Sequence, residues 1–404
     1  MEIETKVTSI DTIKPSSPTP ISLQKHHLSF LDQMFAPILM PIVYFYSSNP
    51  KISKSQFSNH LKTSLSKTLS IYYPLAGRLV GNLYVDCNDA GVPFAEAEAN
   101  CTLSQAVTNP NPQNTYKFAI PPKTLGLCMA VQATYFRCGG VAVAISMSHK
   151  VGDALSAFML AKAWSSSSST DSATPLPKFE AATYFPPQNI PVDVTASALT
   201  KEEHVVRIFT FPESEIAALR ERYSDGGGRR PSRSEALTAF IWTRFITATG
   251  VRSDPLKTCA LTHIVNLRGR VDPPMSEYSF GNILGVSRAN PGAGDDGAEL
   301  VRKMREAVKA VDGGGRNFME ENADLIGNEV VSLGFSSLVG FPGYEVDFGL
   351  GKPVWIGLGW IPFMNTVYFM DSKCGGNGIE TIIILKKHDM DKLQASLVIS
   401  TSKL

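Results

Sequence analysis

The sequence predicts a mixed α/β protein, with mixed α+β sheets in two halves of the chain. The chain has 404 residues, of which 43% are hydrophobic, so it can bury a large core and exceeds the usual length of one domain. Strand and helix patterns mix without the regular strand–helix–strand order of a doubly wound sheet. A Ser- and Pro-rich stretch without periodicity separates the halves. We therefore expect domains at 1–185 and 204–404, joined by a crossover at 186–203.

The expected elements of the first half begin with a helix over residues 53–70. Ser53 and Gln56 fit the capping box of a helix N-terminus, and apolar side chains repeat every four residues on one face. Residues 72–78 contain Pro and Gly, which end this helix and turn the chain. Apolar and β-branched runs then predict strands at 79–85, 127–136 and 141–147, followed by a helix at 153–164.

The second half repeats this mixture of elements. Helices are expected at 213–223 and 232–249, and a charged amphipathic helix is expected between the glycine loops of 294–316. Strand patterns recur at 204–211, 258–267, 282–287, 354–357, 366–370 and 378–385.

Charge and composition exclude several classes of protein. The 38 basic and 37 acidic residues are mixed along the chain, so we expect neither nucleic acid nor a membrane surface as a partner. No apolar run reaches the roughly 18–20 residues that span a bilayer, and the polar N-terminus has no signal core. The six cysteines form no CxxC pair and are expected to be free thiols. Seven scattered histidines without HExxH predict no metal site.

The sequence ends in Ser402-Lys403-Leu404, a tripeptide that the peroxisomal import receptor recognises. Chain termini are usually exposed and flexible, as such a signal requires. We therefore expect import into peroxisomes, with the cytoplasm as the alternative location.

His149 is the main candidate for a catalytic residue. It follows the apolar run VAVAISM and one serine, at a predicted strand end that can hold an imidazole while its tip faces a cleft. An imidazole can take a proton from an alcohol at cell pH. Taken alone, however, the position favours a structural histidine over a base. Asp153 follows four residues later, and a strand–turn–helix break would let it point away from the imidazole and hold the loop.

Other motifs indicate no phosphate site and no serine nucleophile. The triplet at 347–349 matches the metal-binding DFG of protein kinases, but neither a Gly-rich phosphate loop nor an HRD loop accompanies it. The glycine clusters at 226–228 and 313–315 lack the spacing of nucleotide-binding motifs, and no GxSxG elbow is present.

An ordered set of motifs resembles the plant BAHD acyltransferases. HKVGD at 149–153 fits the HxxxD motif of this family, and DFGLGKP at 347–353 fits its DFGWG motif. Shorter landmarks agree in order, namely PSSPTP, HLSFLDQ, YYPLAGRL, VDCNDAGVPF, VNLR and the GN pair at 281–282. The resemblance covers nearly the whole chain. Its N-terminal landmarks look most like the vinorine-synthase-like branch, which contains alkaloid and terpenoid acetyltransferases.

This resemblance implies two chloramphenicol-acetyltransferase-like domains with an active-site channel at their interface. It implies a monomeric, acyl-CoA-dependent O-acyltransferase of plant specialised metabolism, with acetyl-CoA as co-substrate and neither a permanent cofactor nor a metal. His149 would be the general base that deprotonates a small-molecule alcohol, which then attacks the thioester directly. In the family the HxxxD aspartate pairs with an arginine, so Asp153 is expected to pair with Arg268 and fix the loop.

The second motif makes Asp347 a further catalytic candidate by resemblance. Because this motif lies away from the reacting atoms in the family, we interpret Asp347 as structural, together with Gly349 and Gly351. Leu350 occupies the position of the motif tryptophan. This departure removes a large packing surface on the CoA side.

Four more residues are candidates for contacts with the substrates. Ser232 and Arg233 begin a predicted helix, where N–H groups and a cation suit the phosphates of CoA. Asn282 and Thr366 are candidate donors to the oxyanion of the tetrahedral intermediate.

Two other functions are weighed against acyl transfer. A non-catalytic relative that binds a small molecule or a protein would fit the loss of the motif tryptophan, but the intact HKVGD and Arg268 argue against it. A carrier-protein-dependent condensation enzyme uses a related motif that has a second histidine before it and a glycine after it. Ser148 and Ala154 occupy those positions here, and no carrier domain follows.

Overall fold

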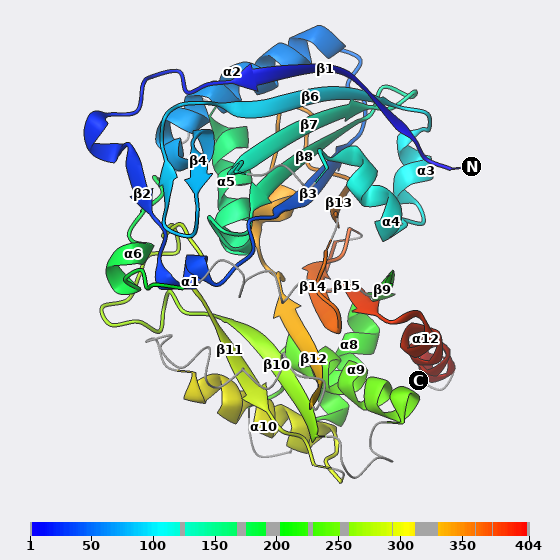
Figure 1. The fold of residues 1–404 in the computed structure, drawn as a ribbon. Helices are drawn as coiled ribbons and strands as arrows, with labels where there is room; N and C mark the ends of the chain where they lie inside the picture. Colours follow the sequence, from blue (N-terminus) through cyan, green and yellow to red (C-terminus); the bar gives the residue numbers. More distant parts are fainter. Residues whose placement is uncertain are drawn as a thin grey trace. The chain divides into compact units, whose positions relative to one another are not determined.

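The computed structural model divides the chain into two compact units (Figure 1). Unit 1 comprises Met1–Ala196, Met275–Ile283 and Phe341–Ile361, and unit 2 comprises Ser197–Pro274, Leu284–Gly340 and Pro362–Leu404. Two segments from the C-terminal half therefore fold with the N-terminal half, which the expected division at a single linker did not include. The structure describes residues 2–121, 126–167, 175–190, 203–224, 229–250, 258–292, 294–311, 330–359, 361–373 and 375–401.

Unit 1 contains a six-stranded sheet in the order β1-β6-β7-β8-β3-β13 (Figure 1). β6 and β7 pair in parallel, whereas the other neighbours are antiparallel. All residues of β8 are buried, since β7 and β3 flank it on both sides. The expected strand at 141–147 is thus confirmed as an inner strand. The strands are β1 (Thr5–Ile13), β3 (Leu39–Tyr46), β6 (Val92–Ala99), β7 (Met129–Tyr135), β8 (Val141–Ser148) and β13 (Trp355–Leu358).

Two long helices of unit 1, α2 (Lys54–Ile71) and α5 (Ala154–Ser166), pack against each other. α2 begins with the expected capping box, because Ser53 Oγ accepts a hydrogen bond from Gln56 N and Gln56 Oε1 accepts one from Ser53 N. Trp164 Nε1 of α5 donates to Ser64 Oγ of α2 at 3.0 Å. The expected apolar face of α2 is buried as Phe57, Leu61, Leu65 and Leu69.

A small sheet in the order β2-β5-β4 completes unit 1. The run expected as one strand at 79–85 is a hairpin, because the chain turns at Gly81, whose φ is 55°. The small sheet consists of β2 (Lys25–His27), β4 (Arg78–Val80) and β5 (Tyr84–Asp86). The short helices are α1 (Phe30–Gln33), α3 (Leu103–Val107), α4 (Pro112–Thr115) and α6 (Ala181–Tyr184).

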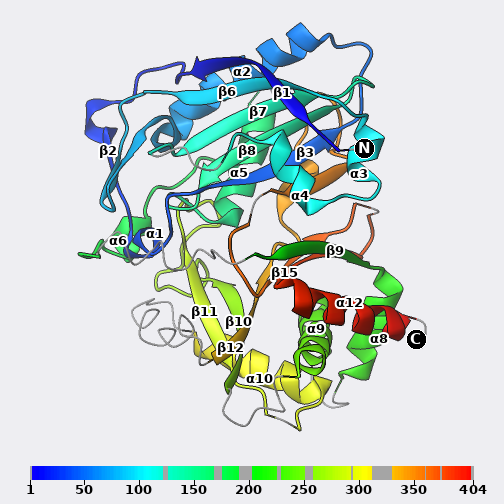
Figure 2. The ribbon, with the colours of Figure 1, turned by 45° about the vertical axis from the view of Figure 1, so that its right-hand side comes forward.

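Unit 2 contains a second six-stranded sheet in the order β11-β10-β12-β14-β15-β9 (Figure 2). β10, β12 and β14 are parallel, and the outer pairs are antiparallel. Its strands are β9 (Val205–Phe211), β10 (Thr258–Asn266), β11 (Leu284–Ala289), β12 (Val330–Ser337), β14 (Thr366–Asp371) and β15 (Ile379–Leu385). Both sheets mix the two pairings, which confirms the mixed α/β class.

α9 lies at the centre of the core of unit 2, where it packs against three other helices (Figure 2). The charged helix expected within 294–316 is α10, whose Leu300, Val301 and Met304 are buried. No helix in the described part of the chain is long and apolar enough to cross a membrane. Ser402-Lys403-Leu404 lies outside the described residues, so peroxisomal import stays a prediction. The helices are α8 (Glu213–Arg222), α9 (Arg233–Thr249), α10 (Gly297–Ala310) and α12 (Lys387–Thr401).

Candidate active site

His149 directly follows the carboxyl end of β8. Its backbone N–H donates to the Ile38 carbonyl oxygen at 2.9 Å, which extends the pairing of β8 beyond the start of β3. Val151 N then donates to Ser148 O at 3.0 Å as the chain turns toward α5. The side chain of His149 is partly exposed, whereas Ser148 and Lys150 are buried. An inner strand thus holds the histidine backbone while the imidazole stays accessible.

Asp153 joins the start of α5 to the segment around residue 282. Its Oδ1 accepts a hydrogen bond from Ser156 N at 2.8 Å, which caps α5. Its Oδ2 accepts one from Ile283 N at 3.2 Å, and its own N–H donates to Gly281 O at 3.2 Å. Because the side chain is 2% exposed, these hydrogen bonds are shielded from water. Asp153 therefore fixes the turn that follows His149.

Two side chains orient the imidazole of His149. The ring of Phe35 stacks on it with a centroid distance of 4.2 Å and an interplanar angle of 13°. On the ring edge, His149 Nδ1 lies 3.1 Å from Asn282 Oδ1. Asn282 Nδ2 also donates to the backbone oxygen of His149 at 2.8 Å. The amide of Asn282 thus contacts both the ring and the backbone of the histidine.

Asn282 is itself held by Asp32, a residue that the sequence pattern did not single out. Asp32 Oδ1 accepts hydrogen bonds from Asn282 N at 2.8 Å and from Asn282 Nδ2 at 2.9 Å. Both side chains are at most 1% exposed. With its two amide hydrogens bound to Asp32 and His149, Asn282 has no side-chain donor left for an oxyanion. These hydrogen bonds do not support the expected role of Asn282 at the oxyanion, which stays a prediction.

Asp32 owes its own position to the N-terminus of α1. Ser29 and Asp32 form a capping box, in which Ser29 N and Ser29 Oγ donate to Asp32 Oδ2 at 2.9 and 2.6 Å. The spacing of a serine and an acidic residue three positions later is a local signal that could have identified this cap. Its contact with a segment 250 residues away leaves no such signal.

Burial lowers the pKa of His149 below its usual value, against the smaller opposing effects of its hydrogen bonds and of the carboxylates of Asp153 and Asp32. Desolvation disfavours the charged imidazolium, so the ring is neutral at pH 7. A neutral imidazole can accept a proton, as a general base must.

The buried side chain of Lys150 also stabilises the loop that contains His149. Lys150 Nζ donates to Asn82 Oδ1 at 2.7 Å and to Gln33 O at 3.2 Å. Burial lowers the pKa of Lys150 to about 8, while the charge of Asp32 opposes this shift. The ammonium group links the residue after His149 to the end of α1.

The second motif forms a tight, exposed loop. Asp347 Oδ1 accepts hydrogen bonds from Gly349 N at 2.7 Å and from Gly351 N at 2.9 Å. The φ angles of these glycines are 88° and 84°, a region that residues with a Cβ rarely adopt. These contacts support a structural role for Asp347, Gly349 and Gly351, as the sequence interpretation proposed.

Leu350 lines an open hollow of about 800 Å³ in unit 1. The wall includes apolar side chains such as Phe57, Phe136 and Val141. Tyr135 also lines it, and the ammonium nitrogen of Lys54 lies 4.5 Å from the centroid of the Tyr135 ring. The motif tryptophan that is absent here would therefore have an apolar wall to pack against.

The candidate CoA contacts lie in unit 2 and already have local partners. Ser232 is the N-cap of α9, and its Oγ accepts a hydrogen bond from Glu235 N at 3.2 Å. Arg233 donates through Nη1 to Asn377 O at 3.0 Å and lies 3.8 Å from Asp371. The carboxylate of Glu235 in the first turn already complements this helix end. Contacts of Ser232 and Arg233 with CoA stay a prediction.

Two further candidates also lie in unit 2. Thr366 begins β14, and its hydroxyl donates to Phe363 O at 2.8 Å, which commits the hydrogen that an oxyanion would need. Arg268 is buried, with its N and Nη1 donating to Asn266 Oδ1 at 3.1 and 3.2 Å. Asp153 belongs to unit 1, and its ion pair with Arg268 stays a prediction.

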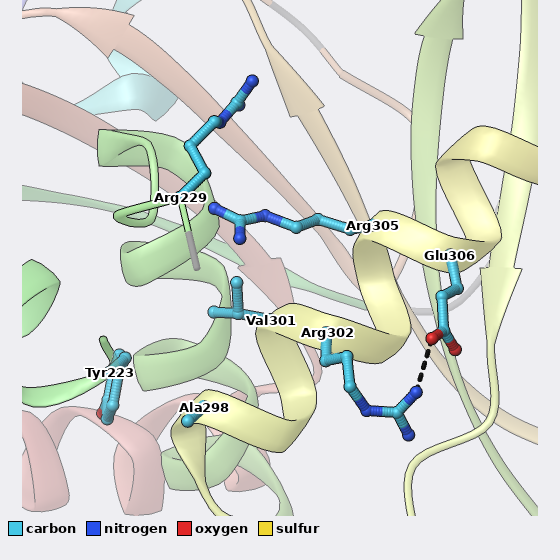
Figure 3. A pocket seen from close by; sticks show the side chains of 7 residues that line it. All are labelled: Tyr223, Arg229, Ala298, Val301, Arg302, Arg305 and Glu306. Atoms are coloured by element: carbon cyan, nitrogen blue, oxygen red, sulfur yellow. Dashed lines mark hydrogen bonds and ion pairs between the residues drawn. The ribbon is translucent and has the colours of Figure 1, made fainter. Parts of the chain in front are cut away.

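A smaller hollow of about 130 Å³ in unit 2 is lined by α10 and by Tyr223 and Arg229, which lie between α8 and α9 in the chain (Figure 3). Arginines line it, but Arg302 is paired with Glu299 and Glu306, and Arg305 is paired with Glu235. Its lining contains no histidine, so it lacks the imidazole base that the HxxxD motif provides. Within the described ranges, no cluster of three or more His, Cys, Asp or Glu could hold a metal ion.

Sequence comparison agrees with the motifs over nearly the full length. The model of a family described as "Transferase family" matches residues 1–397. The chain is 31% identical to stemmadenine O-acetyltransferase of Catharanthus roseus, with 98% of each chain covered. It is 33% identical to vinorine synthase of Rauvolfia serpentina, with 96% of each chain covered.

Structural comparison leads to the same group of proteins. The crystal structure of vinorine synthase superposes with a TM-score of 0.86 at 31% identity and covers 96% of each chain. A structure of F. graminearum TRI101 complexed with coenzyme A and T-2 mycotoxin has a TM-score of 0.69 at 16% identity, and covers 92% of this chain and 97% of that one. At this identity the second likeness concerns the fold alone.

Proposed function

Because the chain belongs to the Transferase family of BAHD acyl-CoA-dependent acyltransferases, we propose that it acetylates a small-molecule alcohol with His149 as the general base. It is an acyl-CoA-dependent acyltransferase of plant specialised metabolism, as its relatives are. The acetyl donor and the hydroxyl acceptor are inferred from the name of the O-acetyltransferase among these relatives.

The observation that carries this proposal is the environment of the His149 imidazole. Burial lowers the pKa of His149, so the ring is a neutral base at pH 7. Its Nδ1 is engaged by Asn282 Oδ1 at 3.1 Å, so Nε2, on the other side of the ring, is the atom that takes the proton. Phe35 and the end of β8 hold the ring in one orientation, which a general base requires.

In the proposed reaction, proton transfer to His149 accompanies attack on the thioester. His149 Nε2 takes the proton of the acceptor hydroxyl as its oxygen attacks the thioester carbonyl. The tetrahedral intermediate collapses, the carbon–sulfur bond breaks and the ester is released. The imidazolium returns its proton to the CoA thiolate, so the histidine ends neutral and no covalent enzyme intermediate forms. General base catalysis of this kind contributes about 10²–10⁴ to the rate.

Asp153 and Asp347 support this chemistry without transferring protons. Asp153 holds the turn after His149 through its bonds to Ser156 and Ile283. Asp347 shapes an exposed glycine loop. Both carboxylates accept hydrogen bonds from backbone N–H groups, which suits a structural role.

The proposal is tested by release of free CoA from acetyl-CoA or benzoyl-CoA, with fractions of a plant extract as the pool of acceptors. Product masses are measured beside CoA release, and binding of each acyl-CoA is measured separately by calorimetry. We expect consumption of acetyl-CoA and a product that has gained one acetyl group. The acceptor can then be isolated from that product.

Two results would contradict this assignment in different ways. Consumption of benzoyl-CoA alone would replace the acetyl donor by an aromatic one. If the protein bound neither acyl-CoA, the result would favour a non-catalytic member of the family. The replacement of the motif tryptophan by Leu350 is the feature of the sequence that fits this alternative.

A further inference from the structure

We propose that Asp32 is a positioning residue that keeps the proton of neutral His149 on Nδ1, by fixing the orientation of the Asn282 side-chain amide. This inference rests on the proposed function, in which His149 Nε2 is the base. Asp32, Asn282 and His149 all belong to unit 1, and hydrogen bonds connect them.

The orientation of the Asn282 amide follows from its neighbours. One end of the amide lies 2.9 Å from Asp32 Oδ1 and 2.8 Å from the backbone oxygen of His149. A backbone carbonyl oxygen can only accept, and the same Asp32 Oδ1 also accepts from the backbone N–H of Asn282 at 2.8 Å. This end must therefore be the NH2 group, since a flipped amide would place its oxygen against two oxygens.

The tautomer of His149 follows from the other end of the amide. Asn282 Oδ1 faces His149 Nδ1 at 3.1 Å, and an amide oxygen can only accept a hydrogen bond. In the neutral ring the nitrogen that donates carries the hydrogen, and the other nitrogen carries the lone pair. The proton is therefore on Nδ1 and the lone pair on Nε2, where the acceptor alcohol needs it.

Asp32 can set this orientation because its own hydrogen bonds hold its carboxylate in place. Its second oxygen accepts hydrogen bonds from Ser29 N and Ser29 Oγ at 2.9 and 2.6 Å within the capping box of α1. The side chain is 1% exposed, so water does not compete for these bonds. Burial raises the pKa of Asp32, but all four hydrogen bonds oppose that shift. The oxygen that faces Asn282 accepts in either protonation state, because a backbone N–H points at it.

The backbone oxygen of His149 also holds the amide and accepts a hydrogen bond from the ring of the same residue, so loss of Asp32 weakens the preference for Nδ1–H without removing it. We expect Asp32→Ala to lower kcat in proportion to the share of the Nδ1–H form that is lost, about twofold for an equal mixture of tautomers. The KM for acyl-CoA should change less, because the base and not the binding of the donor is affected.

The matched control is Asp32→Asn. An asparagine at this position keeps its oxygen toward Asn282, because two N–H groups face that side. On the other side the Ser29 hydroxyl can accept as well as donate. The asparagine loses the charge and places an NH2 group against Ser29 N, which damages the capping box. If Asp32 only stabilised α1, the asparagine variant would be impaired as strongly as the alanine variant.

The tautomer is measured by NMR of full-length protein labelled with ¹⁵N and ¹³C in histidine, with the His149 signals assigned by their loss in His149→Gln. We expect the Nδ1–H form in wild type and in Asp32→Asn, and a mixture of both tautomers in Asp32→Ala. Pure Nδ1–H in Asp32→Ala would overturn the proposal even if kcat fell. If Asp32→Ala does not fold, Asn282→Ala must show the mixture instead, and a pure Nδ1–H form there would overturn it as well.

The NMR measurement tests the role of Asp32 independently of acyl transfer. The tautomer is observed in the resting protein and needs no acceptor or acyl-CoA. An Nδ1–H form that depends on Asp32, in a protein that transfers no acyl group, would sustain the positioning role and reject the proposed reaction.

Discussion

Asp153→Asn separates a structural aspartate from one that acts in the chemistry. Asparagine caps a helix about as well as aspartate, so the bond from Ser156 N to Oδ1 should persist. At Oδ2 the new NH2 group would face the N–H of Ile283, where a hydrogen bond of 3.2 Å is now accepted. Loss of a buried hydrogen bond to a charged group costs about 1.5–3 kcal/mol. For a unit of this size, such a loss lowers the Tm by roughly 5–10 °C.

The exposed N-cap Asp296 provides the matched control. Its Oδ1 accepts from Glu299 N at 2.9 Å in the same geometry, but it lies at the surface. Asp296→Asn should change the free energy of unfolding by no more than about 0.5 kcal/mol. The assay is thermal and urea unfolding of both variants, combined with kcat measured below the transition.

Activity should fall together with stability in Asp153→Asn, since the turn after His149 shifts. A displacement of about 1 Å at a reacting group can cost about 10² in rate. The reasoning would be refuted if Asp153→Asn unfolded like Asp296→Asn and yet lost more than about 10³ in kcat. That result would give Asp153 a direct part in proton transfer.

Three further predictions concern pH, the second motif and the hollow beside it. Burial keeps the pKa of His149 below 6.5, so kcat/KM should rise with pH and reach a plateau, and the midpoint of this rise should lie below pH 6.5. A midpoint above pH 6.5 would contradict a buried neutral base. Asp347→Ala leaves two glycine N–H groups without their acceptor and should lower the unfolding midpoint and activity together, while Asp347→Asn, which keeps an acceptor oxygen, should retain both. Equal loss of kcat in the two variants at unchanged stability would assign Asp347 to the chemistry. Leu350→Trp should raise the free energy of unfolding by about 1 kcal/mol by filling the hollow of unit 1, and an unchanged midpoint in urea would show that the indole does not pack there.

Local elements of the fold could be predicted from the sequence because their signals lie within a few residues. The capping box of Ser53 and Gln56 and the four-residue apolar repeat identified α2 to within one residue at each end. The apolar run before His149 identified β8 in the same way. Such patterns depend on backbone geometry within one element, and no distant contact is needed to interpret them.

The division of the chain could not be predicted in this way. β13 pairs with β3, although some 300 residues separate Phe45 from Trp355. A short strand of four residues carries no periodicity that would reveal its partner. For this reason the expected boundary at a single linker omitted Met275–Ile283 and Phe341–Ile361 from the first unit.

The candidate site shows the same limit. His149 and Asp153 were identified from their motif, and their local geometry agrees with a strand–turn–helix break. Asn282 was a candidate donor to an oxyanion. Its partners, Asp32 and the histidine backbone, are distant in sequence and left no local signal. The orientation of an amide depends on such partners, which become visible only in the folded structure.

The most direct test of the central claim is a comparison of wild type and His149→Ala in single-turnover acyl transfer, with acyl-CoA binding measured on the same preparations. The account predicts that His149→Ala binds acetyl-CoA with nearly unchanged affinity and transfers the acetyl group about 10²–10⁴ times more slowly. Transfer at the wild-type rate in a variant that still binds acetyl-CoA would contradict the assignment of His149 as the general base.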